Sequence, residues 1–315
     1  MKKRISYILF LIATVIWGFA FVAQKTASSI PPFAVGAIRS LFAAVFLLAL
    51  IPLTDRLTKN GRRLITPKKT LDFNRAEIKG GLVLGVILTI ATAFQQYGIG
   101  EGTDAGKAAF ITALYVIVVP IISTLFGKRP SVCAVISIPV AIVGFYLLCI
   151  KPGAAFVASD LLVLMCAVIF ACHIIAVDRL SPECDGVRMS CVQFTTALVL
   201  NGLLTLIFER PASVGEIIEA LPSLLFLGIL SSGIAYTFQI LGQKEADPTV
   251  SSIILSLESV FGVIGAALFL SERMDVREYI GCGVVFVVVL LAQLDPRVIG
   301  EKIKGVRPTI KEKNE

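Results

Sequence analysis

Residues 80–100 read GGLVLGVILTIATAFQQYGIG and contain no Asp, Glu, Lys or Arg. A helix of about 20 apolar residues spans the hydrocarbon core of a bilayer, which is roughly 30 Å thick. Two further stretches of similar length, 31–54 and 249–271, contain one charged residue each, Arg39 and Glu258. The sequence therefore predicts an all-α integral membrane protein with ten transmembrane helices. The other charge-free stretches are 5–24, 108–127, 130–150, 161–177, 189–208, 220–243 and 279–294.

The composition of the whole chain agrees with this fold class. Of the 315 residues, 56% are hydrophobic and only 16% are charged, and the mean hydropathy is +0.87. Soluble domains have about 25% charged residues, so a water-soluble protein is excluded. The net charge of +7 lies in short segments between the apolar stretches, not in a basic stripe with interleaved aromatic residues. This distribution argues against nucleic-acid binding.

Cysteine and histidine usage gives no sign of a metal site. The seven cysteines form no CxxC pair, most of them lie inside apolar stretches, and His173 is the single histidine. Disulfides and metal sites need paired or clustered ligands. We therefore expect buried free thiols, no metal site and no cofactor. Residues 100–108 (GEGTDAGKA) lack the spacing of a phosphate-binding loop, so ATP is not expected to drive the protein directly.

The distribution of Lys and Arg predicts how the helices are oriented. With the N-terminus inside, the cytoplasmic segments hold 22 of the 29 basic residues, the opposite side holds 6, and Arg39 is the remaining one. Basic residues concentrate on the cytoplasmic side of a membrane. The first apolar stretch lacks a small-residue cleavage site and is expected to remain as a span. We therefore expect a multi-pass protein of the cytoplasmic membrane with both termini cytoplasmic.

A weak internal repeat divides the chain into two halves. A shift of 143 residues aligns the third and fourth apolar stretches with the eighth and ninth. We expect one repeat at 1–150, a second at 151–295 and a basic cytoplasmic tail at 296–315. Because five helices per half is an odd number, the second half would cross the membrane in the opposite sense, an arrangement typical of secondary transporters with a substrate site between the halves. The matched pairs are Leu84–Leu227, Gly85–Gly228, Gln96–Gln239, Asp104–Asp247, Ile111–Ile254 and Leu114–Leu257.

Four short motifs carry a resemblance to a known superfamily. They are WGFAF at 17–21, IRSL at 38–41, AFITALYV at 109–116 and SLESVF at 256–261. In these motifs and in its duplication, the chain resembles the EamA type of the drug/metabolite transporter superfamily. The resemblance implies a ten-helix inverted-repeat carrier that moves small metabolites, often outward. The chain departs from the pattern at Ser259, where similar proteins usually have Pro, so a helix kink at this point is in question.

Two charged residues lie well inside apolar stretches. A lone charge in a membrane helix costs at least about 2.5 to 3.5 kcal/mol on insertion scales, so Arg39 and Glu258 need a compensating interaction. In the functional interpretation both face a central cavity: Arg39 holds an anionic group of the substrate, and Glu258 binds a cationic group or accepts a proton that drives transport. In the structural interpretation Arg39 snorkels or pairs with backbone carbonyls, and Glu258 is neutral and hydrogen-bonded between helices.

Uncharged polar and aromatic residues complete the set of candidate substrate-binding residues. Two glutamines related by the repeat are expected at opposite ends of a cavity, although hydrogen bonding between helices is the commoner use of such amides. Three aromatic residues are candidates to stack on a substrate, and the histidine is a candidate to titrate near neutral pH; packing is the alternative for all four. Beside Arg39 and Glu258, the set contains Gln96, Gln239, Trp17, Tyr115, Tyr236 and His173.

These features predict a secondary transporter, an exporter or exchanger of a small metabolite, and not an enzyme. It would work by alternating access, with or without coupling to protons, as a monomer or a homodimer in the lipid bilayer. One positive and one negative contact would suit a zwitterion such as an amino acid. One alternative is a membrane-embedded enzyme acting on lipid-linked substrates. Such an enzyme needs several catalytic residues at one depth in the membrane, and the candidates here, Glu258, His173 and Arg39, lie on three different helices. The other is a receptor or scaffold without transport.

Overall fold

The computed structural model describes residues 2–58, 72–127, 130, 132–149, 157–270 and 275–292. Within these residues all regular secondary structure is helical, as the apolar stretches predict. The basic tail predicted at 296–315 lies outside the described residues. The helices of the first half are α1 (Lys2–Thr26), α2 (Pro32–Thr58), α3 (Arg75–Gly100), α4 (Ala105–Ala113), α5 (Tyr115–Leu125) and α6 (Val132–Cys149).

The second half contains more and shorter elements than the first. In place of one helix over 220–243, it has a ten-residue π-helix, η1, with one α-helical segment before it and one after it. The helices are α7 (Ala158–Leu180), α8 (Gly186–Phe208), α9 (Val214–Glu219), α10 (Leu221–Leu225), η1 (Phe226–Ala235), α11 (Tyr236–Gln243), α12 (Pro248–Leu255), α13 (Glu258–Phe269) and α14 (Val276–Ala292).

Eight helical segments of the described chain are long and apolar enough to cross a membrane. They correspond to eight of the ten predicted spans; the predicted fifth and tenth appear as shorter apolar helices, Val135–Leu147 and Tyr279–Val288. Large apolar side chains point outward from the bundle, among them Leu125 and Leu206, which are 80% and 84% exposed. Such side chains would be unfavourable in water, and they fit a surface that is solvated by lipid.

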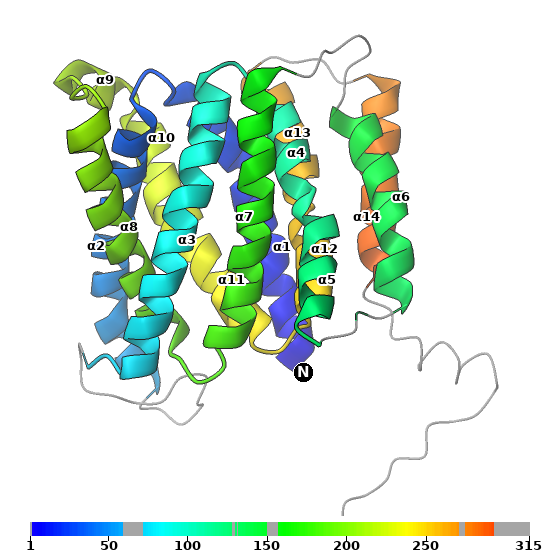
Figure 1. The fold of residues 1–315 in the computed structure, drawn as a ribbon, viewed down its shortest axis with the longest axis horizontal. Coiled ribbons are helices and arrows are strands. Elements are labelled where there is room, and N and C mark those ends of the chain that lie inside the picture. The colour runs from blue at the N-terminus through cyan, green and yellow to red at the C-terminus, as the bar shows by residue number, and fades with distance from the viewer. Residues whose placement is uncertain are drawn as a thin grey trace, which may run out of the picture.

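The helices run up and down in one bundle (Figure 1). In this view α1 begins at the lower end, and α8 rises to α9 at the upper end. Because only residues 181–185 separate α7 from α8, α7 descends and is antiparallel to α1. The α6 and α14 helices pack against each other at one edge, whereas α2 packs on α8 at the opposite edge. The helices between these edges surround the site described below.

Two predicted spans, 108–127 and 249–271, are broken near their centres and not continuous. The first is interrupted at Leu114, between α4 and α5, and the second at Ser256 and Leu257, between α12 and α13. At both breaks backbone N–H groups bond three residues back: Leu114 to the Ile111 carbonyl at 3.2 Å, and Leu257 to the Ile254 carbonyl at 3.1 Å. These tighter turns end one helix and begin another.

The break in the second half forms without the proline that similar proteins usually have. The Ser256 hydroxyl donates to the Ile253 carbonyl at 2.7 Å, and the Ser259 hydroxyl donates to the Ser256 carbonyl at 2.8 Å. Serine side chains that bond to nearby carbonyls compete with the regular helix ladder and bend it. The substitution of Ser259 for proline therefore does not prevent the interruption.

Candidate functional site

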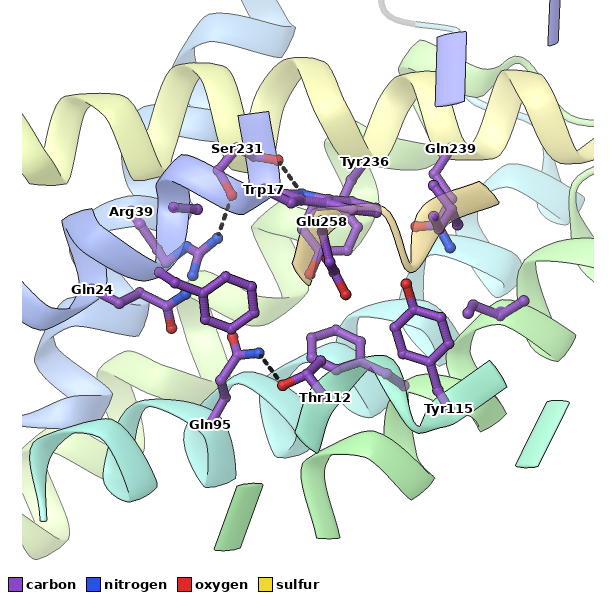
Figure 2. Close-up of a pocket in the computed structure, with 15 residues that line it drawn as sticks. Trp17, Gln24, Arg39, Gln95, Thr112, Tyr115, Ser231, Tyr236, Gln239 and Glu258 are labelled. Carbon is purple, nitrogen blue, oxygen red and sulfur yellow. Dashed lines mark hydrogen bonds between the residues drawn. The ribbon is translucent and has the colours of Figure 1, made fainter. Parts of the chain in front are cut away.

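A polar pocket lies inside the bundle, with a cavity volume of about 40 Å³. Figure 2 shows side chains from both halves of the chain converging on it. The lining residues are Trp17, Ala20, Phe21, Gln24, Arg39, Gln95, Thr112 and Tyr115 from the first half, and Phe170, Ile174, Ser231, Tyr236, Gln239, Leu255 and Glu258 from the second.

An aromatic pair crosses the middle of the pocket. The rings of Trp17, on α1, and Tyr236, on α11, have centroids 4.7 Å apart and planes tilted by 58°. The Trp17 indole N–H donates to the backbone carbonyl of Ser231 at 3.3 Å, which fixes the ring against η1. Tyr236 is held from behind by an edge-on contact with Phe194 at 5.6 Å. The pair therefore forms an aromatic wall of the pocket, with Arg39 toward one end and Tyr115 toward the other (Figure 2).

Arg39 occupies one end of the pocket. Its Nε donates to the Ser232 hydroxyl at 3.0 Å, and its Nη2 donates to the Ser231 hydroxyl at 3.1 Å. The residue is only 6% exposed. The amide of Gln24 lies at the same end (Figure 2). This end thus combines one buried positive charge with neutral hydroxyl and amide groups.

Tyr115 lies toward the other end and Glu258 lies between it and Arg39 (Figure 2), each as the first residue after a helix break. The Glu258 carboxyl and the Tyr115 hydroxyl both point into the pocket, together with the Gln239 amide (Figure 2). Among the described residues, Glu258 Oε1 and the Tyr115 hydroxyl have no hydrogen-bond partner at bonding distance. Gln239 donates to Gln243 at 2.9 Å, and its own carbonyl oxygen is unpartnered. This end therefore offers buried polar atoms to a ligand.

The structure brings together six of the eight predicted site residues and places the other two outside the pocket. His173 packs edge-on against Tyr236, with ring centroids 5.8 Å apart, and does not line the pocket. Gln96 donates to the backbone carbonyl of Gln24 at 3.2 Å and lines a second pocket near the upper end. Gln24 and Gln96 thus lie between the central pocket and this upper pocket.

The upper pocket has a cavity volume of about 210 Å³ and lies between the α1–α2 turn and the end of α3. Arg210 lines it and forms an ion pair with Glu216, with Nη2 2.6 Å from Oε1. The hydrogen bond from Arg210 lowers the pKa of Glu216 to about 2. The Arg210 guanidinium also donates to the Ser29 carbonyl at 3.1 Å. This pair therefore ties the segment after α8 to the turn after α1.

Sequence reasoning missed several polar residues of the pocket. Gln24, Thr112 and Ser231, which line the pocket, and Ser232, which accepts from Arg39, carry no charge, and single serines and threonines are common in membrane helices. The contact between Arg39 and Ser232 joins positions 193 residues apart, so no local pattern reveals it. A pair of adjacent serines in the middle of an apolar stretch is the one signal that could have identified 231 and 232.

The chain is similar to known proteins over most of its length. The model of the EamA-like transporter family matches this chain twice, over residues 4–150 and 157–294. An uncharacterized transporter of Archaeoglobus fulgidus is 26% identical over 300 residues, which cover 93% of this chain and 87% of the relative. The uncharacterized transporter YoaV of Bacillus subtilis is 24% identical over 288 residues, which cover 86% and 92% of the two chains.

A solved crystal structure shares the fold. It superposes with a TM-score of 0.72 at 17% sequence identity, and the match covers 93% of this chain and 98% of the other. The two family matches together take in nearly the whole sequence, and each contains one of the two broken helices described above. The chain is a multi-pass membrane protein, and it belongs to the EamA-like transporter family.

Proposed function

We propose that this protein is a secondary transporter that carries a small metabolite, such as an amino acid, across the cytoplasmic membrane. Export or exchange by alternating access is the mode that we infer. The observation that carries the proposal is the central pocket, to which both halves contribute side chains, Trp17 and Arg39 from one and Tyr236 and Glu258 from the other. In inverted-repeat carriers the substrate site lies between the halves, and a rocking motion exposes it to each side in turn.

The proposed topology has ten spans, arranged as two inverted repeats over 1–150 and 151–295. The antiparallel course of α1 and α7 supports inversion (Figure 1), because these helices open the two family matches. The segments on the same side of the membrane as the N-terminus hold the excess of basic residues, which supports cytoplasmic termini. On this assignment the lower end in Figure 1 faces the cytoplasm and the upper pocket faces outward.

Proton coupling is the finer part of the proposal, and it rests on Glu258. Among the residues that line the pocket, Glu258 carries the one carboxyl group. A buried carboxyl can exist in charged and neutral forms, and a change of side exposes it to a different pH. Glu258 would therefore bind a proton on one side of the membrane and release it on the other.

The direct test is flux through purified protein in proteoliposomes. A broad panel of metabolites, amino acids included, would be offered inside and outside the vesicles and followed by mass spectrometry. We expect at least one compound to move only when the protein is present, and to show accelerated exchange against itself. Chemical conversion of the compound would indicate the enzyme alternative. Folded protein that moves nothing in the panel would leave the scaffold alternative.

A substitution that fills the pocket tests whether the transport route passes through it. Ala20→Leu adds three carbons to a lining residue that is only 3% exposed, so it should reduce flux by about tenfold or more, since overpacking displaces a ligand. Ala76→Leu, at an exposed position near the start of α3, is the control. Equal flux in both variants would show that the route does not pass through this pocket.

A further inference from the structure

The buried guanidinium of Arg39 has no carboxylate partner among the described residues, and this points to a ligand-binding role. The guanidinium is buried and makes two hydrogen bonds, both to neutral serine hydroxyls. No carboxylate of the described residues lies within ion-pair distance of it, although Glu258 lines the same pocket. A buried cation without a counter-ion is unfavourable unless an anion completes the site.

Another buried arginine in the same chain is paired with carboxylates. Arg188 is fully buried at the lower end of α8, and its Nη2 donates to both carboxylate oxygens of Asp55 at 2.9 and 2.8 Å. Asp185 lies 3.5 Å from its Nη1. Lys107 likewise pairs with the buried Asp160 at 2.5 Å. At Arg188 and Lys107 the chain supplies a carboxylate, but at Arg39 the described residues supply none.

The π-helix η1 holds the Arg39 side chain in place. Gly228 of η1 packs so closely on α2 that a Cβ there would lie 2.5 Å from the Phe42 Cβ and 3.0 Å from the Arg39 carbonyl oxygen. This contact brings the consecutive Ser231 and Ser232 hydroxyls to one guanidinium. Two of its five N–H groups are used by these serines, and each serine that accepts from Arg39 keeps its own O–H as a donor.

We propose that Arg39, positioned by Ser231 and Ser232, is a carboxylate-binding subsite, and that the cargo of this transporter carries a carboxylate. The inference rests on the proposed transport function and specifies the class of its substrate. Arginine N–H groups pair with the two oxygens of a carboxylate in a planar arrangement. One unpaired guanidinium balances one carboxylate, whereas a phosphate ester carries nearly two charges. Ser231 and Ser232 are positioning residues, since they act through the guanidinium.

The single tryptophan of the chain, Trp17, lines the pocket and reports on its occupancy by fluorescence. The probes are amino acids, hydroxy acids and short fatty acids, each paired with its own primary amide, together with phosphate monoesters. We expect at least one carboxylate to change the Trp17 emission of the purified full-length protein, and its amide to bind at least about tenfold more weakly. Equal binding of acid and amide, a response to phosphate esters alone, or no response to any carboxylate would overturn the inference.

Variants separate positioning from folding. Ser231→Ala with Ser232→Ala should raise the apparent Kd, and the KM for flux, about 3- to 10-fold while the maximal rate stays within about twofold, because two charged hydrogen bonds are lost but the charge remains. Arg39→Gln should abolish the discrimination between acid and amide, and Arg39→Lys should restore part of it. The control is Ser251→Ala with Ser252→Ala, a second pair of consecutive buried serines, whose hydroxyls donate to the backbone carbonyls of Asp247 and Thr249 at the start of α12.

The flux assay distinguishes this inference from the proposed function. Transport of amides, sugars or amines with no preference for carboxylates would leave the transporter proposal intact and remove the subsite. Binding of carboxylates through Arg39 without movement across the membrane would retain the subsite and remove transport. An effect of the control pair as large as that of Ser231 and Ser232 would reduce the serines to a packing role.

Discussion

The two broken helices, α4–α5 and α12–α13, are built alike but deliver different chemistry. The 143-residue shift aligns Leu114 with Leu257, and each of them caps the start of a helix, α5 and α13 respectively. The next residue begins a new helix and faces the pocket in both halves: Tyr115 in the first half and Glu258 in the second. Related backbone positions thus present a phenol and a carboxyl. The repeat supplies the geometry, and the difference between its copies supplies the titratable group.

The largest expected effect tests this difference at the two positions directly. Glu258→Gln removes the titratable group while keeping its size, so proton-driven accumulation in proteoliposomes should fall at least about tenfold while exchange at equal pH continues. Tyr115→Phe removes only a hydroxyl and should lower the rate by no more than about fivefold, with the pH dependence unchanged. Glu219→Gln, on the exposed helix α9, is the control. Unchanged pH dependence in Glu258→Gln would refute its assigned role.

One broken helix, through α13, should pack more tightly against α1 than against the other broken helix. A Cβ on Gly18 of α1 would lie 2.3 Å from the Phe261 Cβ and 2.7 Å from the Phe261 carbonyl carbon of α13. Gly18→Ala should therefore cost about 1 to 3 kcal/mol, because backbone must move. Gly106→Ala in α4 creates only an ordinary 3.5 Å contact with Val263, also of α13, and should not destabilise. Thermal unfolding in detergent measures both, and equal losses would show that α13 packs as tightly against α4 as against α1.

The smallest effect concerns the residues that start these helices, Asp104 and Asp247, which the repeat also pairs. The Asp247 carboxylate accepts from the Thr249 N–H at 2.8 Å, whereas Asp104 makes no side-chain cap bond to α4. Asp247→Ala should lower the free energy of unfolding by about 1 kcal/mol, as loss of an N-cap does. Asp104→Ala should have a smaller effect. The same unfolding assay applies, and a larger loss at Asp104 would contradict the difference in capping.

A difference between the two copies of the repeat explains why only one residue of an aligned pair of predicted site residues lines the central pocket. Gln96 aligns with Gln239, but only Gln239 lines the pocket; in the first half the preceding residue, Gln95, lines it instead. The second copy contains η1 upstream of Gln239, whereas α3 is a regular α-helix. A π-helix bonds five residues back instead of four, so it changes the register of the residues that follow. A one-residue offset of this kind is invisible in the alignment.

The sequence by itself determined the membrane fold, the family resemblance and the two charges worth explaining. Charge-free stretches of about 20 residues predict membrane-spanning helices. A charge inside such a stretch is costly, so Arg39 and Glu258 are conspicuous without any structure. These are local properties of composition and length, and they need no knowledge of which helices touch.

Only the tertiary structure decided which side chains meet. It showed the breaks at Leu114 and Ser256, and the π-helix that brings Ser231 and Ser232 to Arg39. It also placed His173 behind Tyr236 and not in the pocket. Whether a neutral polar side chain faces a pocket or a neighbouring helix depends on the rotation of its helix, which a single offset in the hydrogen-bond ladder alters. That rotation is set by packing between segments far apart in the chain, and no local pattern of residues records it.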